Sequence, residues 1–318
     1  MTDSQAPALA IDGLKVSIRS DDGLAQVLDH IDLVIPRGRI VGVVGESGCG
    51  KSTLIRSILG ILPEAATVDR GSIRFYGRDL LKLSQGEMSR DIRGKEIGFI
   101  PQDPYLAFNP VFKVGRQLLE IMRWHAGPES GGPGDRKRHR ETLIELLRIV
   151  QIPDPEAALE RYPHQFSGGQ RQRLLIAGAL CCRPKLLIAD EPTTALDVTT
   201  QLQILRLLKR LSEEFEISML FVTHDFGVVA QLCDEVAVIY AGQTAEHGPV
   251  RDILQTPRHP YARMLIDCHP DRSADLVGIP GAVPSPVAPP PGCRFHDRSA
   301  ACSMRRRSTH DVRRPADP

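Results

Sequence analysis

The sequence predicts an α/β fold, and three short patterns indicate it. A compact apolar run at Ile40–Val44 is followed by a glycine-rich stretch and then by helical periodicity over Ser52–Leu59. This strand–loop–helix order is how an α/β unit begins. Leu186–Ala189 and Met219–Val222 are two more short, fully apolar runs, of the kind found in buried parallel strands. Helical patterns separate or follow these runs, so the chain alternates strands and helices as this class requires.

The N-terminal part of the chain predicts an antiparallel β subdomain. Leu9–Ile18 alternates apolar and polar residues, as a half-buried strand does, and Val27–Ile35 has the pattern of a second strand. Asp21, Asp22 and Gly23 predict a turn between the two strands. Residues 1–7 are expected to be a disordered N-terminus.

Two later regions differ in sequence pattern or composition from the rest of the chain. From Pro104 to about Phe166, helical periodicity at Val114–Arg123 and Glu141–Val150 predicts a helical insertion. After about Pro257 the chain becomes linker-like, and six of the twelve residues from Pro280 to Pro291 are proline. We therefore expect a main domain over residues 8–257, with its helical subdomain at about 104–166, and a short proline-rich C-terminal extension over residues 258–318.

The overall composition excludes several classes of protein. The chain has 318 residues, 42% hydrophobic and 25% charged, which is ordinary globular usage and excludes bulk disorder. Its net charge of +1 argues against a whole-chain binder of polyanions. No segment approaches the roughly 18–20 apolar residues needed to span a bilayer, and the N-terminus has no secretion signal. Seven cysteines in this length do not indicate a disulfide framework, so a reducing, cytosolic compartment is expected.

One glycine-rich segment carries a phosphate-binding pattern. It fits G-x-x-x-x-G-K-[ST] and lies between a predicted strand and a predicted helix, as that pattern requires. With Thr53, its residues are the expected nucleotide-binding residues: Gly45, Glu46, Ser47, Gly48, Cys49, Gly50, Lys51 and Ser52. Backbone N–H groups would turn inward around the phosphates, and the helix dipole would assist. Lys51 is expected to reach the β- and γ-phosphates and Ser52 to bind Mg²⁺, while Cys49 is expected to be a small filler. The alternative is an ordinary glycine-rich turn.

Two adjacent carboxylates follow the apolar run Leu186–Ala189. Ligands of open α/β sheets bind at the carboxyl ends of the strands, which is where Asp190 and Glu191 would lie. Asp190 would hold Mg²⁺, directly or through water, and Glu191 would polarise an attacking water. Alone, two acids after a strand more often form a turn or a helix cap. Paired with the phosphate-binding pattern, they predict a catalytic role.

A third motif precedes Asp190 and opens a predicted helix. It consists of Ser167, Gly168, Gly169 and Gln170, after Phe166. By itself it is also the pattern of an N-capped helix start. With the two other motifs, it makes the chain resemble the nucleotide-binding subunit of an ATP-binding-cassette (ABC) transporter. The resemblance implies that Ser167–Gln170 is the signature segment, which binds the γ-phosphate of an ATP held by the facing subunit.

The remaining motifs of that family occur in order. Gln102 matches the glutamine that senses Mg²⁺ and the attacking water, Asp197 matches the loop that crosses the dimer interface, and His224 matches the histidine that contacts the γ-phosphate. The resemblance therefore implies a P-loop ABC ATPase cassette that uses ATP and Mg²⁺. In it Glu191, His224 and Gln102 are catalytic, Ser52, Gln102 and Asp190 hold the metal, and Asp197 lies at the nucleotide.

Two segments and the tail narrow the resemblance to the dipeptide, oligopeptide and nickel importers. The segments are residues 102–111 and 161–173, and the tail residues are His259–Tyr261, Ile279–Gly281, Val283–Pro286 and Gly292–His296. This branch implies ATP-driven solute import, with a peptide as the main expectation. Nickel, glutathione, an opine and a sugar stay open as alternatives, because this kind of subunit does not touch the solute.

Two features depart from the family pattern. Relatives place an aromatic residue, which stacks on adenine, where this chain has Ile18. The tails of many relatives also carry cysteines that can bind an iron–sulfur cluster. Cys293 matches the first of these, but Ser299 stands at the next position and Cys302 is out of register. Since such a cluster takes four thiolates, we expect this chain not to hold one.

The resemblance also implies partners. Two ATPase subunits, identical or related, would form a head-to-tail dimer with two ATP molecules at the interface. Two membrane permease subunits would dock a helix in a groove of the helical insertion, and an extracytoplasmic solute-binding protein would supply the solute. The chain would then lie on the cytoplasmic face of the inner membrane as a peripheral subunit, without nucleic acid.

The competing class is a soluble ABC ATPase that acts on DNA or ribosomes. Such proteins typically carry long coiled-coil insertions or two cassettes, whereas this chain has one phosphate-binding pattern and no sustained heptads. The basic run Arg136–Arg140 points toward nucleic acid, but a run of this length at a helix start is usually a solvated face. The importer is therefore the main expectation.

Overall fold

The fold is known from a computed structural model that describes residues 6–127, 132, 134–268 and 278–299. The chain forms two compact units. The first contains the residues up to Lys82 and from Phe221 onward, and the second is Leu83–Leu220. Most of the N-terminus expected to be disordered, residues 1–5, lies outside the described residues, as does Cys302.

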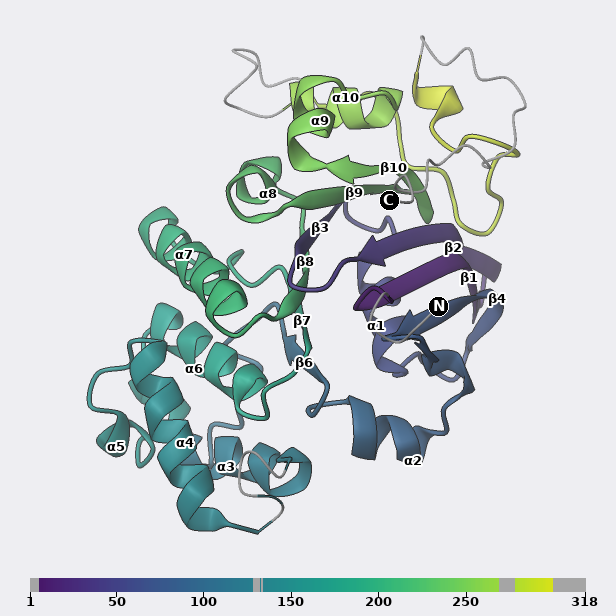
Figure 1. The fold of residues 1–318 in the computed structure, drawn as a ribbon. Coiled ribbons are helices and arrows are strands. Elements are labelled where there is room, and N and C mark those ends of the chain that lie inside the picture. Colours follow the sequence, from purple (N-terminus) through teal and green to yellow (C-terminus); the bar gives the residue numbers. More distant parts are fainter. Residues whose placement is uncertain (1–5, 128–131, 133, 269–277, 300–318) are drawn as a thin grey trace. The chain divides into compact units, whose positions relative to one another are not determined.

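The first unit contains an antiparallel sheet in the order β2-β1-β4-β5. Its strands lie side by side in Figure 1 and are β1 (Leu9–Ser20), β2 (Gly23–Ile35), β4 (Ala66–Phe75) and β5 (Arg78–Asp79). β1 pairs with β2 from Leu9 opposite Ile35 to Ser20 opposite Gly23. Leu14 and Val16 are fully buried while Lys15 between them is partly exposed, which is the two-residue period of a strand with one buried face.

A second set of strands in this unit holds β3 (Ile40–Val44) beside β9 (Glu235–Tyr240), and β9 beside β10 (Gln243–Pro249). β3 runs parallel to β9, and all five of its residues are buried. A continuous apolar run fits this place because a parallel strand is covered on both faces. The α-helices in the described part of this unit are α1 (Lys51–Leu59), α8 (Phe226–Leu232), α9 (Val250–Gln255) and α10 (Pro260–Asp267).

The described part of the C-terminal extension packs into this unit. Tyr261 and Phe295 are fully buried, and they share a hydrophobic core with Val44 of β3 and Tyr240 of β9. The extension also contains α10 and a short 3₁₀ turn at His296–Arg298. No secondary structure is predicted for these residues from their sequence, because their proline-rich composition is typical of a linker. The sequence does not indicate that a few aromatic side chains pack them onto the first unit.

The second unit is mostly helical. Strands β6 (Ile97–Ile100) and β7 (Leu186–Asp190) of this unit run parallel, with Ile97 opposite Leu186 and Ile100 opposite Ala189. Its helices are α2 (Gln85–Glu87) with a π-helical turn at Met88–Ile92, α3 (Val114–His125), α4 (Arg136–Ile149), α5 (Pro155–Ala158), α6 (Gly168–Leu180) and α7 (Val198–Glu214). β8 (Ser218–Thr223) contains the division between the two units.

The predicted strands and helices occur, most of them extended by a few residues at one end. The strand predicted at Ile40–Val44 has those bounds, and the helix predicted from Glu141 begins five residues earlier, at Arg136. β4, β5, β6, β9 and β10 have no counterpart in the sequence-based prediction. β4 contains Gly71, and eight of its ten residues are partly or fully exposed, so its apolar alternation is weak.

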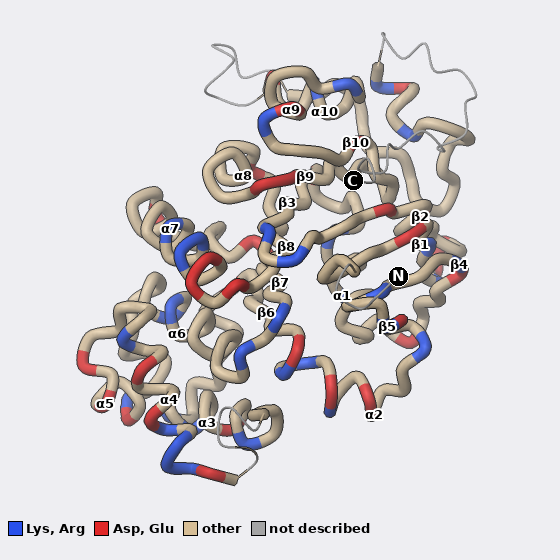
Figure 2. The backbone as a smooth tube through the Cα atoms, in the orientation of Figure 1, with Lys and Arg blue, Asp and Glu red and all other residues tan. Residues whose placement is uncertain are grey.

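Charges are spread over both units, as Figure 2 shows. The basic run Arg136–Arg140 lies in the first turns of α4, with Asp135 before it and Glu141 after it, and only His139 within it is buried. None of the helices among the described residues is both long enough and apolar enough to cross a membrane.

Candidate functional site

The phosphate-binding pattern forms the connection between β3 and α1 in the first unit. Gly48 and Gly50 have φ values of +79° and +108°, in the left-handed region that favours glycine. A Cβ atom on Gly45 would lie 2.1 Å from the carbonyl oxygen of Ile239, so only glycine fits there. Gly50 is the N-cap of α1 and supplies no side chain to cap the first-turn N–H groups. These amides are therefore arranged to bind an anion.

Lys51 is buried within this loop, with 8% of its surface exposed. Its Nζ donates hydrogen bonds to the carbonyl oxygens of Gly45, at 2.7 Å, and of Glu46, at 3.1 Å. Cys49 is 1% exposed, and burial raises the pKa of its thiol. A buried, protonated thiol is the small apolar filler expected from the sequence.

Glu46 makes contacts with the C-terminal extension. Its backbone N–H donates to the Tyr261 hydroxyl at 2.9 Å, and its carboxylate accepts two hydrogen bonds from Arg298, at 2.7 and 3.2 Å. Tyr261 is predicted from the sequence only as part of a family motif, and Arg298 is not predicted at all. No local pattern predicts these contacts, because Arg298 lies 252 residues from Glu46.

In the second unit, Gln102 and Glu191 are brought together by the pairing of β6 with β7. The last paired residues are Ile100 and Ala189, so the segments that follow them leave the sheet at the same edge. Gln102 Nε2 donates to the Glu191 carboxylate at 3.3 Å, and Thr194 Oγ1 donates to the same oxygen at 3.1 Å. Glu191 has a φ of +42°, which is uncommon for a residue with a side chain. The carboxylate is therefore directed by two hydrogen bonds and by its backbone.

Asp190 is the last residue of β7 and is partly exposed. Its carboxylate, the Gln102 amide oxygen and the Ser52 hydroxyl are hard oxygen donors, which is the ligand chemistry that Mg²⁺ prefers. Ser52 belongs to the first unit and the other two residues to the second. The residue types expected to hold the metal thus fit that ion.

The signature segment begins α6 in the second unit. Ser167 is the N-cap: its hydroxyl accepts from the Gln170 N–H at 3.3 Å, and the Gln170 side chain accepts from the Ser167 N–H at 3.0 Å. This reciprocal pair is a capping box. A Cβ atom on Gly169 would lie 2.6 Å from a Thr200 methyl, and one on Gly168 would lie 2.9 Å from the Tyr105 hydroxyl. The segment therefore forms a helix start and leaves no room for larger residues.

Two further predicted residues are exposed. Asp197 is the N-cap of α7 and accepts from the N–H and the hydroxyl of Thr200, which lower the pKa of its carboxyl. His224 lies in the turn between β8 and α8, in the first unit. Ile18, at the position where relatives carry a ring, is half-buried in β1 and lies opposite Ala25 of β2 and Ala66 of β4.

The predicted residues thus fall into two groups. The phosphate loop and His224 belong to the first unit, while Gln102, Asp190, Glu191, Asp197 and the signature segment belong to the second. In the tail, Cys293 Sγ lies 3.8 Å from His259 Nε2. Among the described residues, no three His, Cys, Asp or Glu side chains gather as ligands of a metal ion.

Two protein families match the sequence. Residues 28–194 match the family described as "ABC transporter", and residues 245–306 match the "Oligopeptide/dipeptide transporter, C-terminal region". The second match covers the tail that holds Tyr261 and Arg298.

Individual relatives and solved structures agree with these matches. The chain is 46% identical to the dipeptide transport ATP-binding protein DppD of Bacillus subtilis over 91% of this chain and 86% of the relative. It is 43% identical to the probable D,D-dipeptide transport ATP-binding protein DdpD of Escherichia coli over 93% and 89%. A dimeric ATP-binding cassette in a post-hydrolysis state bound to ADP and Pi is 27% identical, with a TM-score of 0.65, over 76% of this chain and 99% of that one.

Proposed function

This chain belongs to the ABC transporter family, and we propose on that premise how its residues act as the ATP-binding, ATP-hydrolysing subunit of a peptide importer. One observation carries this function: the chain joins a cassette that matches the ABC transporter family to a tail that matches the C-terminal region of oligopeptide and dipeptide transporters. A soluble cassette ATPase acting on nucleic acid would not need that tail. Peptides are thus favoured as the solute over the other solutes of the branch.

ATP binding is assigned to the phosphate loop. The uncapped N–H groups of α1 face the phosphates, and Lys51 exchanges its hydrogen bonds with the Gly45 and Glu46 carbonyls for contacts with the β- and γ-phosphates. Ser52, Gln102 and Asp190 are the residues that would hold Mg²⁺, and the ion would neutralise part of the phosphate charge.

Hydrolysis is assigned to Glu191 with His224 and Gln102. Glu191 orients the attacking water and accepts its proton, while Gln102 and Thr194 hold the carboxylate through their hydrogen bonds. His224 contacts the γ-phosphate. Because phosphoryl transfer needs positioning and charge stabilisation more than covalent chemistry, these contacts account for the activity.

A second ATPase subunit completes each site. Ser167–Gln170 and Asp197 contact the nucleotide of the facing subunit, and binding closes the dimer. The dimeric cassette with ADP and Pi supports this arrangement. Two permease subunits at the inner membrane, on its cytoplasmic face, and an extracytoplasmic peptide-binding protein complete the transporter.

The test is to co-express the chain with its permease subunits and to measure ATP hydrolysis and dipeptide uptake in vesicles. We expect Glu191→Gln to bind ATP, to lose both activities and to accumulate a closed ATP-bound dimer. Glu213→Gln is the matched control, since Glu213 is an exposed residue of α7. Normal steady-state hydrolysis by Glu191→Gln would remove Glu191 from the catalytic role. Uptake of another solute but of no peptide would show that the transporter does not import peptides.

A further inference from the structure

Glu46, in the phosphate loop, has all three of its polar groups engaged. Its carbonyl accepts from Lys51, its N–H donates to Tyr261, and its carboxylate pairs with Arg298. Two of the three partners come from the C-terminal extension. We propose that Arg298 is a positioning residue of the nucleotide site, through which docking of the C-terminal extension raises the affinity of the phosphate loop for ATP. The inference rests on the proposed role of the phosphate loop.

The Arg298 side chain is held in place by several contacts besides the one with Glu46. It is 5% exposed, and its Nε donates to the Pro280 carbonyl at 2.7 Å. Its terminal nitrogens donate to the Ile279 carbonyl at 3.0 Å and to the Tyr240 hydroxyl at 3.2 Å, in addition to the Glu46 carboxylate. The ion pair with Glu46 raises the pKa of Arg298, so the guanidinium stays charged. A bidentate pair with a guanidinium held in this way fixes both the position and the charge of the carboxylate.

A cluster of aromatic side chains packs beside the contact between Arg298 and Glu46. The ring of Tyr240 lies 4.5 Å from that of Tyr261 and 5.0 Å from that of Phe295, measured between centroids, and Tyr261 lies 5.3 Å from Phe295. All three residues are at most 2% exposed. They pack on Val44, the last residue of β3, which directly precedes the loop. Burial raises the pKa of Tyr261, which stays neutral and accepts the Glu46 N–H.

The contact matters for nucleotide binding because of charge. Glu46 is one residue after Gly45, and its carbonyl shares Lys51 with the Gly45 carbonyl. With Arg298 in place, its carboxylate is neutralised and turned toward the extension. Without Arg298, an uncompensated negative charge would remain beside the phosphates of ATP, and like charges at short range repel. Coupling between two sites is reciprocal, so bound ATP would also favour docking of the extension.

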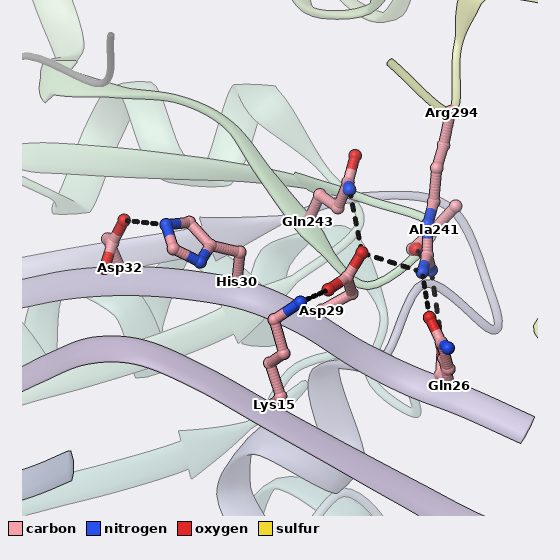
Figure 3. A network of polar contacts seen from close by, with 8 residues as sticks. All are labelled: Lys15, Gln26, Asp29, His30, Asp32, Ala241, Gln243 and Arg294. Atoms are coloured by element: carbon pink, nitrogen blue, oxygen red, sulfur yellow. Dashed lines mark hydrogen bonds and ion pairs between the residues drawn. The ribbon is translucent and has the colours of Figure 1, made fainter. Parts of the chain in front are cut away.

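A second arginine of the extension provides a matched comparison. Arg294 is four residues earlier, and its side chain is 3% exposed. Figure 3 shows it directed at β2, where it pairs with Asp29 at 3.0 Å and donates to the Gln26 carbonyl, and it also donates to the carbonyl of Ala241, between β9 and β10. Asp29 also pairs with Lys15 at 2.6 Å. Arg294 thus holds the extension to the same unit, and none of its hydrogen-bond partners named here belongs to the phosphate loop.

The experiment compares Arg298→Gln with Arg294→Gln in the purified full chain. The dissociation constant for Mg-ATP is measured by isothermal titration, and the thermal unfolding of each variant is recorded without nucleotide. Both variants should lose stability, since each removes a buried ion pair. Only Arg298→Gln should weaken ATP binding, by about tenfold, and Arg298→Lys should recover part of the loss because it keeps the charge.

A double variant separates charge from general loosening. In a Glu46→Gln background, Arg298→Gln should change the affinity less than it does in the wild type, because no unpaired carboxylate remains. Equal loss of affinity in Arg298→Gln and Arg294→Gln, or no loss in either, would overturn the proposal. Failure of the wild-type chain to bind ATP would instead refute the proposed function.

A measurement without any substitution tests the reciprocal effect. Amide hydrogen exchange of residues 293–298 in the wild-type chain should slow when Mg-ATP is added, while exchange in α4 serves as the internal reference. This result decides the matter even if Arg298→Gln does not fold. Unchanged exchange in residues 293–298 at saturating ATP would overturn the proposal.

Discussion

The phosphate loop and the strand end that carries Glu191 are built in different ways. The loop is held from several sides: Lys51 is buried, Gly45 packs against a backbone carbonyl, and Glu46 is held by Tyr261 and Arg298. Glu191 is partly exposed and is directed by hydrogen bonds from Gln102 and Thr194, both of which are exposed.

This difference fits the separate tasks that we propose for the two regions. A site that binds phosphate by fixed N–H groups gains affinity when those groups need no rearrangement. A carboxylate that acts on a water molecule must adopt its final position only when the nucleotide is in place, and hydrogen bonds between exposed groups are easily exchanged. We therefore expect substitutions in the loop to change binding, and substitutions around Glu191 to change turnover.

The largest effect is expected for Lys51→Ala. Removing the only buried ammonium of the described loop should weaken ATP binding by about a hundredfold, since a hydrogen bond from a charged group contributes about 1.5–3 kcal/mol. Titration with Mg-ATP measures the change. Lys185→Ala is the control, because Lys185 forms an exposed ion pair with Glu96 in the second unit. If Lys51→Ala kept normal affinity, the loop would not be the main phosphate contact.

The second largest effect is expected for acid, which should lower the free energy of unfolding through His259. Burial lowers the pKa of His259, at the start of α10, from 6.5 to about 4. The folded protein therefore keeps this ring neutral, while the unfolded chain takes up a proton as the pH falls through 6.5. The contribution of His259 to the free energy of unfolding is therefore complete well above pH 6.5. It declines as the pH falls toward 4, and the loss is about 2 kcal/mol at pH 5.

Urea unfolding at pH 7 and pH 5 measures this loss. His259→Asn retains a side-chain acceptor for the Tyr261 N–H, the hydrogen bond that His259 Nδ1 makes at 3.1 Å, but it cannot titrate. We expect its free energy of unfolding to depend less on pH than that of the wild type. The same slope in both proteins would assign the acid sensitivity to other groups.

Around Glu191, a smaller effect on a different quantity is expected. Gln102→Ala removes a side-chain hydrogen bond to the Glu191 carboxylate, so hydrolysis should fall by about tenfold through loss of orientation. Binding of Mg-ATP should fall by less than hydrolysis does, because Gln102→Ala removes one of three proposed Mg²⁺ ligands but leaves the phosphate loop intact. Thr194→Val, which removes another hydrogen bond to this carboxylate and no proposed Mg²⁺ ligand, should lower hydrolysis with a change in Mg-ATP binding of less than about twofold. A binding defect as large as the hydrolysis defect would contradict the division between the two regions.

The smallest effect is expected at Ile18. This side chain cannot stack on adenine as a ring does, so Ile18→Tyr should tighten ATP binding by about fivefold, near the lower limit for base–aromatic stacking. Titration with Mg-ATP and Mg-GTP should also show that the wild type discriminates weakly between them. Equal ATP affinity in Ile18→Tyr and the wild type would mean that residue 18 does not contact the base.

Local patterns in the sequence predicted much of both regions. Ile40–Val44, the glycines after it and Lys51 lie within one short segment, so their order alone indicated a strand, a phosphate-binding loop and a helix. Asp190 and Glu191 were predicted in the same way from the apolar run before them. β4 was missed because its sequence is mostly polar and contains Gly71, although its pairing with β1 holds it as a strand.

Only the tertiary structure decided which distant residues meet. Gln102 reaches Glu191 because β6 and β7 run parallel and end at one edge, a pairing that neither segment specifies by itself. Arg298 reaches Glu46 across 252 residues because buried aromatic rings hold the extension against β3 and β9. The physical reason is range. A turn or an amphipathic strand is specified by neighbours along the chain, whereas a buried ion pair depends on how whole elements pack.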